Sequence, residues 1–159
     1  MREILISRLL RYMEENNPDL LWQLMEKGMV ASYVVDKLSV VEGLLKDASN
    51  NQPLYIKEEA CFDILTEDLK PSKYHYVLNI LEEDFNEEFK LLDGIGVLKP
   101  EIINMVNYCS EVFSSYNFRE ANEDDRHLRY EMTGMISEYF YQLWSVKGEK
   151  HGIQYSTEA

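Results

Sequence analysis

The side chains best suited to bind a metal ion lie close together in the last third of the sequence. His127 and Glu131 are four residues apart, which would place them on one face of a helix, and Asp124 lies just before them. A protein metal site needs three or four convergent ligands, and the sequence contains neither a His-Glu-x-x-His nor a Cys-x-x-Cys motif. The segment also lacks the glycine and the final glutamate of a calcium-binding loop. We therefore expect no metal and no other cofactor.

Nucleophilic catalysis would need a nucleophile beside a base, and the sequence offers only three histidines as imidazole bases. The cysteines, Cys61 and Cys109, fall on apolar helical stripes, where a thiol is usually an inert buried group. Gly94 and Gly96 are followed neither by a third glycine nor by Lys-Ser/Thr, so they do not indicate a phosphate-binding loop. No catalytic residue is predicted, and a hydrolase or metal-dependent enzyme with an unmarked site is the last of three functional hypotheses.

Acidic residues form the strongest chemical pattern in the chain. The 159 residues contain 29 Asp and Glu against 16 Lys and Arg, a net charge of −13, which argues against a protein that binds nucleic-acid phosphates directly. Two clusters stand out, and together they are the candidate interaction surface: Glu83, Asp84, Glu87 and Glu88 in the first, and Glu123, Asp124 and Asp125 in the second. On a continuous helix the first cluster would occupy one side, away from the apolar stripe.

These clusters have a bland interpretation and a functional one. A solvated acidic surface that aids solubility would explain them without any partner. Alternatively they attract a basic protein partner, or they imitate the phosphates of DNA and inhibit a DNA-binding enzyme. Four tyrosines at the margins of apolar stripes are possible interface anchors, although most tyrosines are expected to belong to the core: Tyr33, Tyr76, Tyr130 and Tyr141.

The elements that must position these residues are helices. Hydrophobic residues make up 45% of the chain, glycine and proline are scarce, and apolar residues recur at helical spacing almost throughout. We predict an all-α fold: one compact domain of about six helices in an irregular bundle over residues 1–147, with a flexible tail at 148–159. Asn17 is expected to cap the helix that Pro18 opens, Gly28 to end that helix, and residues 47–53 to form a linker.

Two long segments are expected to be continuous helices, one from Ser72 through Phe89 and one from Pro100 to Tyr116. In the last helix, Gly134 lies mid-helix at a cost of about 1 kcal/mol relative to alanine. We hypothesise that another helix crosses closely there. No apolar run is long enough to span a bilayer, and with two cysteines and no signal-type segment the expected location is the cytoplasm.

Three segments together resemble a known family. Residues 9–20 are similar to its opening helix and proline turn, residues 72–81 followed by Phe85 to its central motif, and residues 131–136 to its C-terminal Glu-x-Thr-Gly signature. This is the domain-of-unknown-function family numbered eighteen-ninety-six, of Bacteroides-type bacteria. The matching positions are expected to be structural: Pro18, Ser72, Lys73, Tyr74, Asn79, Leu81, Phe85, Glu131, Thr133 and Gly134.

The resemblance implies an all-helical cytoplasmic domain in genomic company suggestive of mobile elements, and it carries no established activity. The leading hypothesis is therefore a non-enzymatic protein–protein interaction or accessory module, and the second is the DNA mimic. We expect an unidentified protein partner, with a basic one favoured by the charge, and neither direct nucleic-acid binding nor a membrane.

Overall fold

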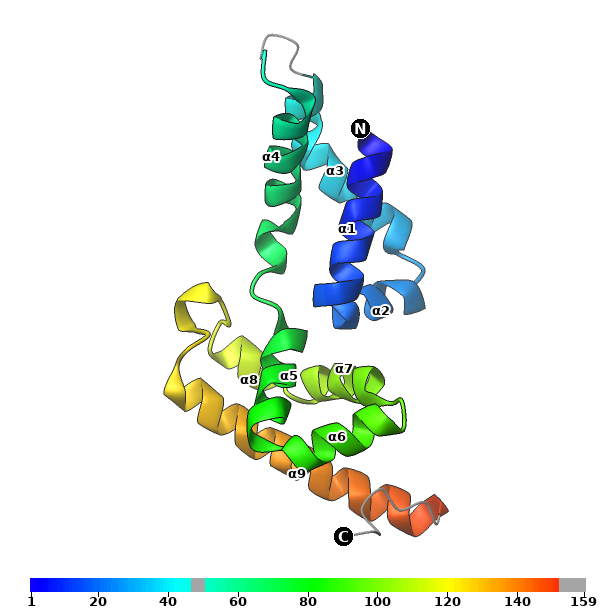
Figure 1. Cartoon of the computed structure of the whole chain (residues 1–159), viewed down its shortest axis with the longest axis vertical. Coiled ribbons are helices and arrows are strands. Elements are labelled where there is room, and N and C mark those ends of the chain that lie inside the picture. Colours follow the sequence, from blue (N-terminus) through cyan, green and yellow to red (C-terminus); the bar gives the residue numbers. More distant parts are fainter. Residues whose placement is uncertain (47–50, 152–159) are drawn as a thin grey trace. The chain divides into compact units, whose positions relative to one another are not determined.

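The computed structural model describes residues 1–46 and 51–151, and within these ranges the chain is helical, without strands (Figure 1). The all-α class predicted from the sequence is confirmed, but the described residues form nine α-helices rather than about six. The elements are α1 (Arg2–Asn16), α2 (Pro18–Glu26), α3 (Val30–Lys46), α4 (Leu54–Thr66), η1 (Glu67–Leu69), α5 (Lys73–Asp84), α6 (Asn86–Gly94), α7 (Leu98–Tyr108), α8 (Ser110–Ser115), η2 (Glu120–Asn122) and α9 (Arg126–His151).

The helices form two compact units, each with its own hydrophobic core. We call Met1–Ser72 the N-terminal unit and Lys73–Ala159 the C-terminal unit. The backbone of α9 is helical through His151, so residues 148–151 of the predicted tail belong to this helix. Residues 152–159 of that tail and 47–50 of the predicted linker lie outside the described ranges. Among the helices described, none is both long and apolar enough to cross a membrane.

The N-terminal unit packs α1, α2 and α3 with α4 around a mainly aliphatic core. Leu5, Leu9 and Met13 repeat every four residues and are fully buried on α1, as the apolar stripe predicts. One aromatic pair, Tyr12 with Phe62, lies at its edge, with ring centroids 5.8 Å apart. The remaining buried members come from α3, α4 and η1: Val34, Leu38, Val41, Cys61, Leu65 and Leu69.

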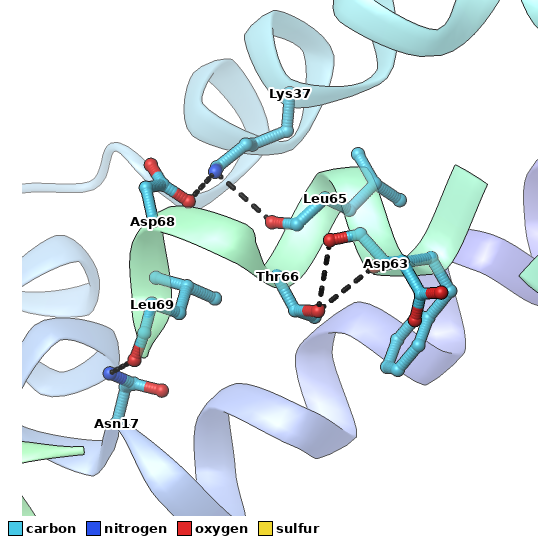
Figure 2. Close-up of polar contacts among 8 residues, drawn as sticks. Asn17, Lys37, Asp63, Leu65, Thr66, Asp68 and Leu69 are labelled. Carbon is cyan, nitrogen blue, oxygen red and sulfur yellow. Dashed lines mark hydrogen bonds and ion pairs between the residues drawn. The ribbon is translucent and has the colours of Figure 1, made fainter. Parts of the chain in front are cut away.

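Polar side chains fasten the end of α4 to the rest of this unit, as Figure 2 shows. Lys37 of α3 donates to the Leu65 carbonyl at 3.1 Å and also to the Asp68 carboxylate, so it satisfies a helix-end carbonyl that has no partner within its own helix. Asn17 does not cap α2 with its side chain, contrary to the prediction: its Nδ2 donates to the Leu69 carbonyl at 3.1 Å, and its Oδ1 accepts from no described donor. Pro18 does open α2, and Gly28 follows it with a φ of +65°.

The C-terminal unit has a core rich in aromatic rings, built by α5, α6, α7, α8 and α9. Phe113 is 1% exposed, and its ring centroid lies 5.0 Å from that of Phe118. One carboxylate is buried with the apolar residues: Glu101 is 5% exposed and accepts a hydrogen bond from the Tyr139 hydroxyl. The fully buried aliphatic and sulfur-containing members are Val77, Ile80, Leu81, Leu92, Ile102, Met105, Cys109, Leu128, Met132 and Ile136.

Both segments predicted to be continuous helices in this unit are in fact divided. The first breaks at Phe85, whose φ of −131° separates α5 from α6, and the second breaks at Cys109, between α7 and α8. Each break changes the helix direction, so that apolar residues before and after it enter one core. Leu81 and Leu92, on either side of the first break, are both fully buried. The Phe85 ring at the bend lies 5.5 Å from that of Phe140.

The hypothesis of a close helix crossing at Gly134 is wrong. Gly134 is exposed, and a Cβ built there would meet no atom within 4 Å beyond its own surroundings in the helix. No neighbouring helix requires the missing side chain at this position.

The other positions of the family motifs have varied structural roles. Leu81 belongs to the core, and the Lys73 ammonium lies 5.4 Å from the centroid of the Phe113 ring. Ser72 donates from its hydroxyl to the carbonyl of Asn16, within the N-terminal unit. The remaining positions are partly buried or exposed: Tyr74 and Thr133 are partly buried, whereas Asn79 and Glu131 are exposed.

Candidate functional site

The break at Phe85 redistributes the first acidic cluster. Glu83 and Asp84 end α5, whereas Glu87 and Glu88 lie in the first turn of α6, where the positive end of the helix dipole favours carboxylates. The prediction that the cluster forms one side of a continuous helix is therefore wrong. Its two halves have different surroundings, and the half at the end of α5 pairs with α9 through Glu83 and Asp84.

That link is Arg129, which lies on the first turns of α9. Its Nη2 donates to Glu83 Oε1 and to Asp84 Oδ2, both at 2.9 Å. Burial disfavours the charged guanidinium, but its hydrogen bonds to the carboxylates of Asp84 and Glu83 outweigh that effect and raise the pKa of Arg129. The guanidinium is thus a permanent cation held between α5 and α9.

Arg129 also borders a pocket of about 280 Å³ that contains the second acidic cluster. Two tyrosines line this pocket: Tyr76 comes from α5 and Tyr130 from α9. The complete lining, which we call the Arg129 pocket, consists of Tyr76, Glu123, Asp124, Asp125, Arg126, Arg129 and Tyr130. Residues from both acidic clusters, far apart in the sequence, therefore lie around a single arginine.

Turn chemistry between α8 and α9 positions the second cluster. Asn122 Oδ1 accepts from the Arg119 amide at 2.9 Å, while its Nδ2 donates to the Tyr116 carbonyl at 2.6 Å, which fixes the loop before η2. Asp125 Oδ1 accepts from the amides of His127 at 2.7 Å and Leu128 at 3.2 Å. Asp125 is therefore the N-cap of α9 and has a structural role, whereas Glu123 and Asp124 are exposed.

Two polar atoms of residues that line the pocket are buried without a partner among the described residues. They are the Tyr76 hydroxyl oxygen and Arg129 Nε. Burial raises the pKa of Tyr76, and the carboxylates of Asp125 and Asp124 add to the rise against the opposing effect of Arg129, so the phenol is neutral and can donate. A buried polar group left unpaired costs about 1–3 kcal/mol, so each of these two atoms carries a local free-energy penalty.

The remaining candidates for chemistry are placed less favourably. Burial raises the pKa of the Cys109 thiol to about 12 and also raises that of Cys61, so neither forms a thiolate at neutral pH. In the part of the chain that the structure describes, no three His, Cys, Asp or Glu side chains are grouped in a way that could hold a metal ion. Gly94 ends α6, and Gly96, with a φ of +81°, lies in the turn before α7.

Sequence reasoning identified the acids and two of the tyrosines of this site, but not its organising residue. Arg129 is an ordinary basic residue in the sequence, and its importance depends on α5 lying beside the start of α9. A weak signal did exist, because Arg129 is four residues after Asp125 on a helix that begins with acids. That spacing suggests only a local ion pair, and the pairing with Glu83 and Asp84 spans 46 and 45 residues.

Comparisons with known proteins identify a family but no better-understood relative. Neither the curated proteins nor the solved structures include a significant match to the chain. The family model described as "Domain of unknown function (DUF1896)" matches residues 6–142, which cover both structural units. The three motifs noted in the sequence lie within that range or overlap it, and the chain belongs to the DUF1896 family.

Proposed function

We propose that this protein is a protein-interaction module that binds a basic segment of a partner through the Arg129 pocket. The observation that carries the proposal is that Arg129, which lines the pocket together with the second acidic cluster, also pairs with Glu83 and Asp84 from more than 40 positions away. An acidic face that served only solubility would not need a concave arrangement or a half-buried arginine to organise it.

The electrostatics of the site favour a cationic ligand. Glu83 and Asp84 already neutralise Arg129, which leaves Arg126 as the second basic residue against Glu123, Asp124 and the capping Asp125. Opposite charge speeds the encounter with a basic partner and selects against acidic ones. The exposed carboxylates of Glu123 and Asp124 are the residues from which we expect most of this selectivity.

The proposal is tested with a fluorescent arginine-rich peptide, because the natural partner is unidentified. We expect the Glu123→Gln/Asp124→Asn variant to bind this peptide at least about tenfold more weakly at low salt, and the difference to shrink as salt screens the charges. The matched control is Glu82→Gln/Glu87→Gln, which removes the same charge from exposed acids outside the pocket. Equal losses in both variants would show attraction to net charge alone and would refute a specific site.

A separate competition experiment with a basic DNA-binding enzyme tests the DNA-mimic alternative. A mimic must compete with duplex DNA for a basic DNA-binding enzyme, so duplex DNA added to such a complex should release the protein. The half-buried Arg129 between the acids weakens this alternative, since a cation interrupts the array of negative charges that a phosphate mimic requires.

A further inference from the structure

We infer that the groove between α3 and α4 is a docking surface for an amphipathic helix of another protein, with apolar residues on one face of that helix and basic residues along its edges. The groove belongs to the N-terminal unit, whereas the Arg129 pocket belongs to the C-terminal unit, so the inference does not rest on the proposed function. It starts from a strip of exposed apolar side chains on these two helices.

The two helices lie side by side and run antiparallel. Lys37 of α3 contacts Leu65 and Asp68 around the end of α4, as Figure 2 shows. Leu45, further along α3, lines a different pocket with Leu54 at the start of α4. A cavity of about 290 Å³ lies between the helices, and its lining defines the α3–α4 groove: Lys37, Val40, Ile64, Leu65, Glu67 and Asp68.

Exposed aliphatic side chains line this groove and continue beyond it. Val40 of α3 is 67% exposed and Ile64 of α4 is 38% exposed, and both line the cavity. Leu44 follows Val40 by one helical turn, and Ile56 precedes Ile64 by two turns with Ala60 between them. Because the helices are antiparallel, both rows extend in the same direction. All five side chains are exposed, and such a contiguous apolar strip is typical of an interaction surface.

The geometry of the strip favours a helix as its occupant. Its apolar residues repeat every four positions, or about 6 Å along each helix, and a ligand helix with apolar residues three to four positions apart has nearly the same repeat. A helix also pairs its own backbone N–H and C=O groups internally. An extended segment would bring unpaired backbone groups against an apolar wall, which is unfavourable.

Carboxylates beside the strip determine the charge of that helix. Glu67 lines the groove, Asp63 lies one turn before it on α4, and Asp36 lies one turn before Val40 on α3. All three acids are exposed, and in the described part of the chain their carboxylates form no ion pair. Basic residues along the edges of a ligand helix would complement these charges.

The basic residues near the groove already have interactions of their own. Lys37 is paired with Asp68, and Lys46, on the last turn of α3, is paired with Glu42. Lys57 of α4 is partly buried and also interacts within the protein. The charges left for a ligand at this groove are therefore mainly negative.

The same charges argue against a second copy of this chain as the occupant. A two-fold pairing of the groove with itself would bring Asp36, Asp63 and Glu67 of one copy near the same acids of the other. Each copy also has a net charge of −13, which opposes association. A basic amphipathic helix avoids this repulsion and still covers the apolar strip.

The test compares two fluorescent peptides that contain equal numbers of leucine and lysine and would each span about four helical turns as a helix. In the first, the leucines have helical spacing; in the second, leucine and lysine alternate, so the net charge is the same. Fluorescence anisotropy with the intact protein measures both affinities. We expect the helical peptide to bind at least about tenfold more tightly. The Val40→Ser/Ile64→Ser variant should lose most of this preference, because it removes apolar contacts from both walls of the groove.

Matched variants test whether the preference belongs to this groove. Met25→Ser/Val35→Ser removes two exposed apolar side chains outside the lining and should keep the preference, as should Glu123→Gln/Asp124→Asn in the Arg129 pocket. Asp63→Asn/Glu67→Gln should weaken binding of the helical peptide about three- to fivefold at low salt and less at high salt. All these positions are exposed, so circular dichroism should show the same helical content in every variant.

Two results would overturn this inference while leaving the proposed function standing. The first is equal affinity of the wild-type protein for the two peptides, or a preference that survives Val40→Ser/Ile64→Ser. The second is a wild-type dimer in analytical ultracentrifugation that dissociates in the same variant, which would assign the groove to a second copy. Conversely, an arginine-rich peptide that binds without dependence on Glu123 and Asp124 would overturn only the proposed function.

Discussion

The two units of this protein differ in what they bury and in what they expose. Of the fourteen large hydrophobic residues exposed within the described ranges, eleven lie in the N-terminal unit, among them Val40 at 67% and Met25 at 61%. By sequence, residues 1–72 carry 13 acids and 8 bases, a net charge of −5, whereas residues 73–159 carry 16 acids and 8 bases, a net charge of −8. The more acidic unit is also the one with the aromatic core.

The difference shows that one chain can divide two kinds of surface between two small cores. In the C-terminal unit, rings such as Phe113 and Phe140 are taken into the core, and the surface is left to charged residues around Arg129. In the N-terminal unit, α2 keeps Trp22 and Met25 exposed at 39% and 61%, three residues apart on one face. Charge attracts partners over a distance and is screened by salt, whereas apolar surface contributes only on contact.

The largest expected effect would come from opening the aromatic core. Phe113→Ala should lower the stability of the C-terminal unit by about 3–5 kcal/mol, because it removes a large ring and leaves a cavity. Leu38→Ala is the aliphatic counterpart in the N-terminal unit, with an expected loss of about 2–5 kcal/mol. Amide hydrogen exchange, resolved by residue, measures each unit separately, and a loss under about 1 kcal/mol for Phe113→Ala would contradict its place in the core.

The second-largest loss of stability is expected from removing the hydrogen bond between Lys37 and the end of α4. Lys37→Ala should destabilise the N-terminal unit by about 1–3 kcal/mol, because the Leu65 carbonyl loses a donor from a side chain only 13% exposed. Lys46→Ala, on the same helix, removes a 78% exposed lysine whose pair with Glu42 spans 3.7 Å, and should cost no more than about 0.5 kcal/mol. Thermal or urea unfolding of the two variants measures the difference, and similar losses would remove the structural role given to Lys37.

The buried carboxylate gives a matched experiment in the other unit. Tyr139→Phe should lower stability by about 1–2 kcal/mol, since Glu101 loses a hydroxyl donor in the core. Tyr141→Phe changes the same atom on a ring that is 77% exposed, and we expect almost no effect. If the two variants unfold alike in urea, the Glu101–Tyr139 contact does not stabilise this core.

The smallest expected effect has the opposite sign. Gly134→Ala should stabilise α9 by about 0.5–1 kcal/mol, because alanine restricts the unfolded chain and nothing lies where its methyl group would be. A melting curve of the variant measures this gain. Destabilisation would mean that a close neighbour, which the structure does not show at this position, contacts Gly134 after all.

Local features of the sequence determined most of the helices. Apolar stripes such as Leu5, Leu9 and Met13 can be recognised in the sequence because helical geometry repeats every 3.6 residues. Pro18 and Gly28 mark helix ends through their own backbone preferences. The excess of acidic residues and the two acidic clusters can also be recognised directly, because both follow from the residue types alone. These features need no knowledge of which helix packs against which.

Tertiary packing decided where the predicted helices bend and what their side chains contact. Nothing local forbids a helix through Phe85 or Cys109, and each break is favoured because it directs residues on both sides into one core. The side chain of Asn17 likewise reaches the distant Leu69 carbonyl and makes no cap to the helix beside it. Arg129 bridges Glu83 and Asp84 only because α5 and α9 meet, and the free energy that joins such distant residues comes from burying apolar surface, which sequence spacing does not reveal.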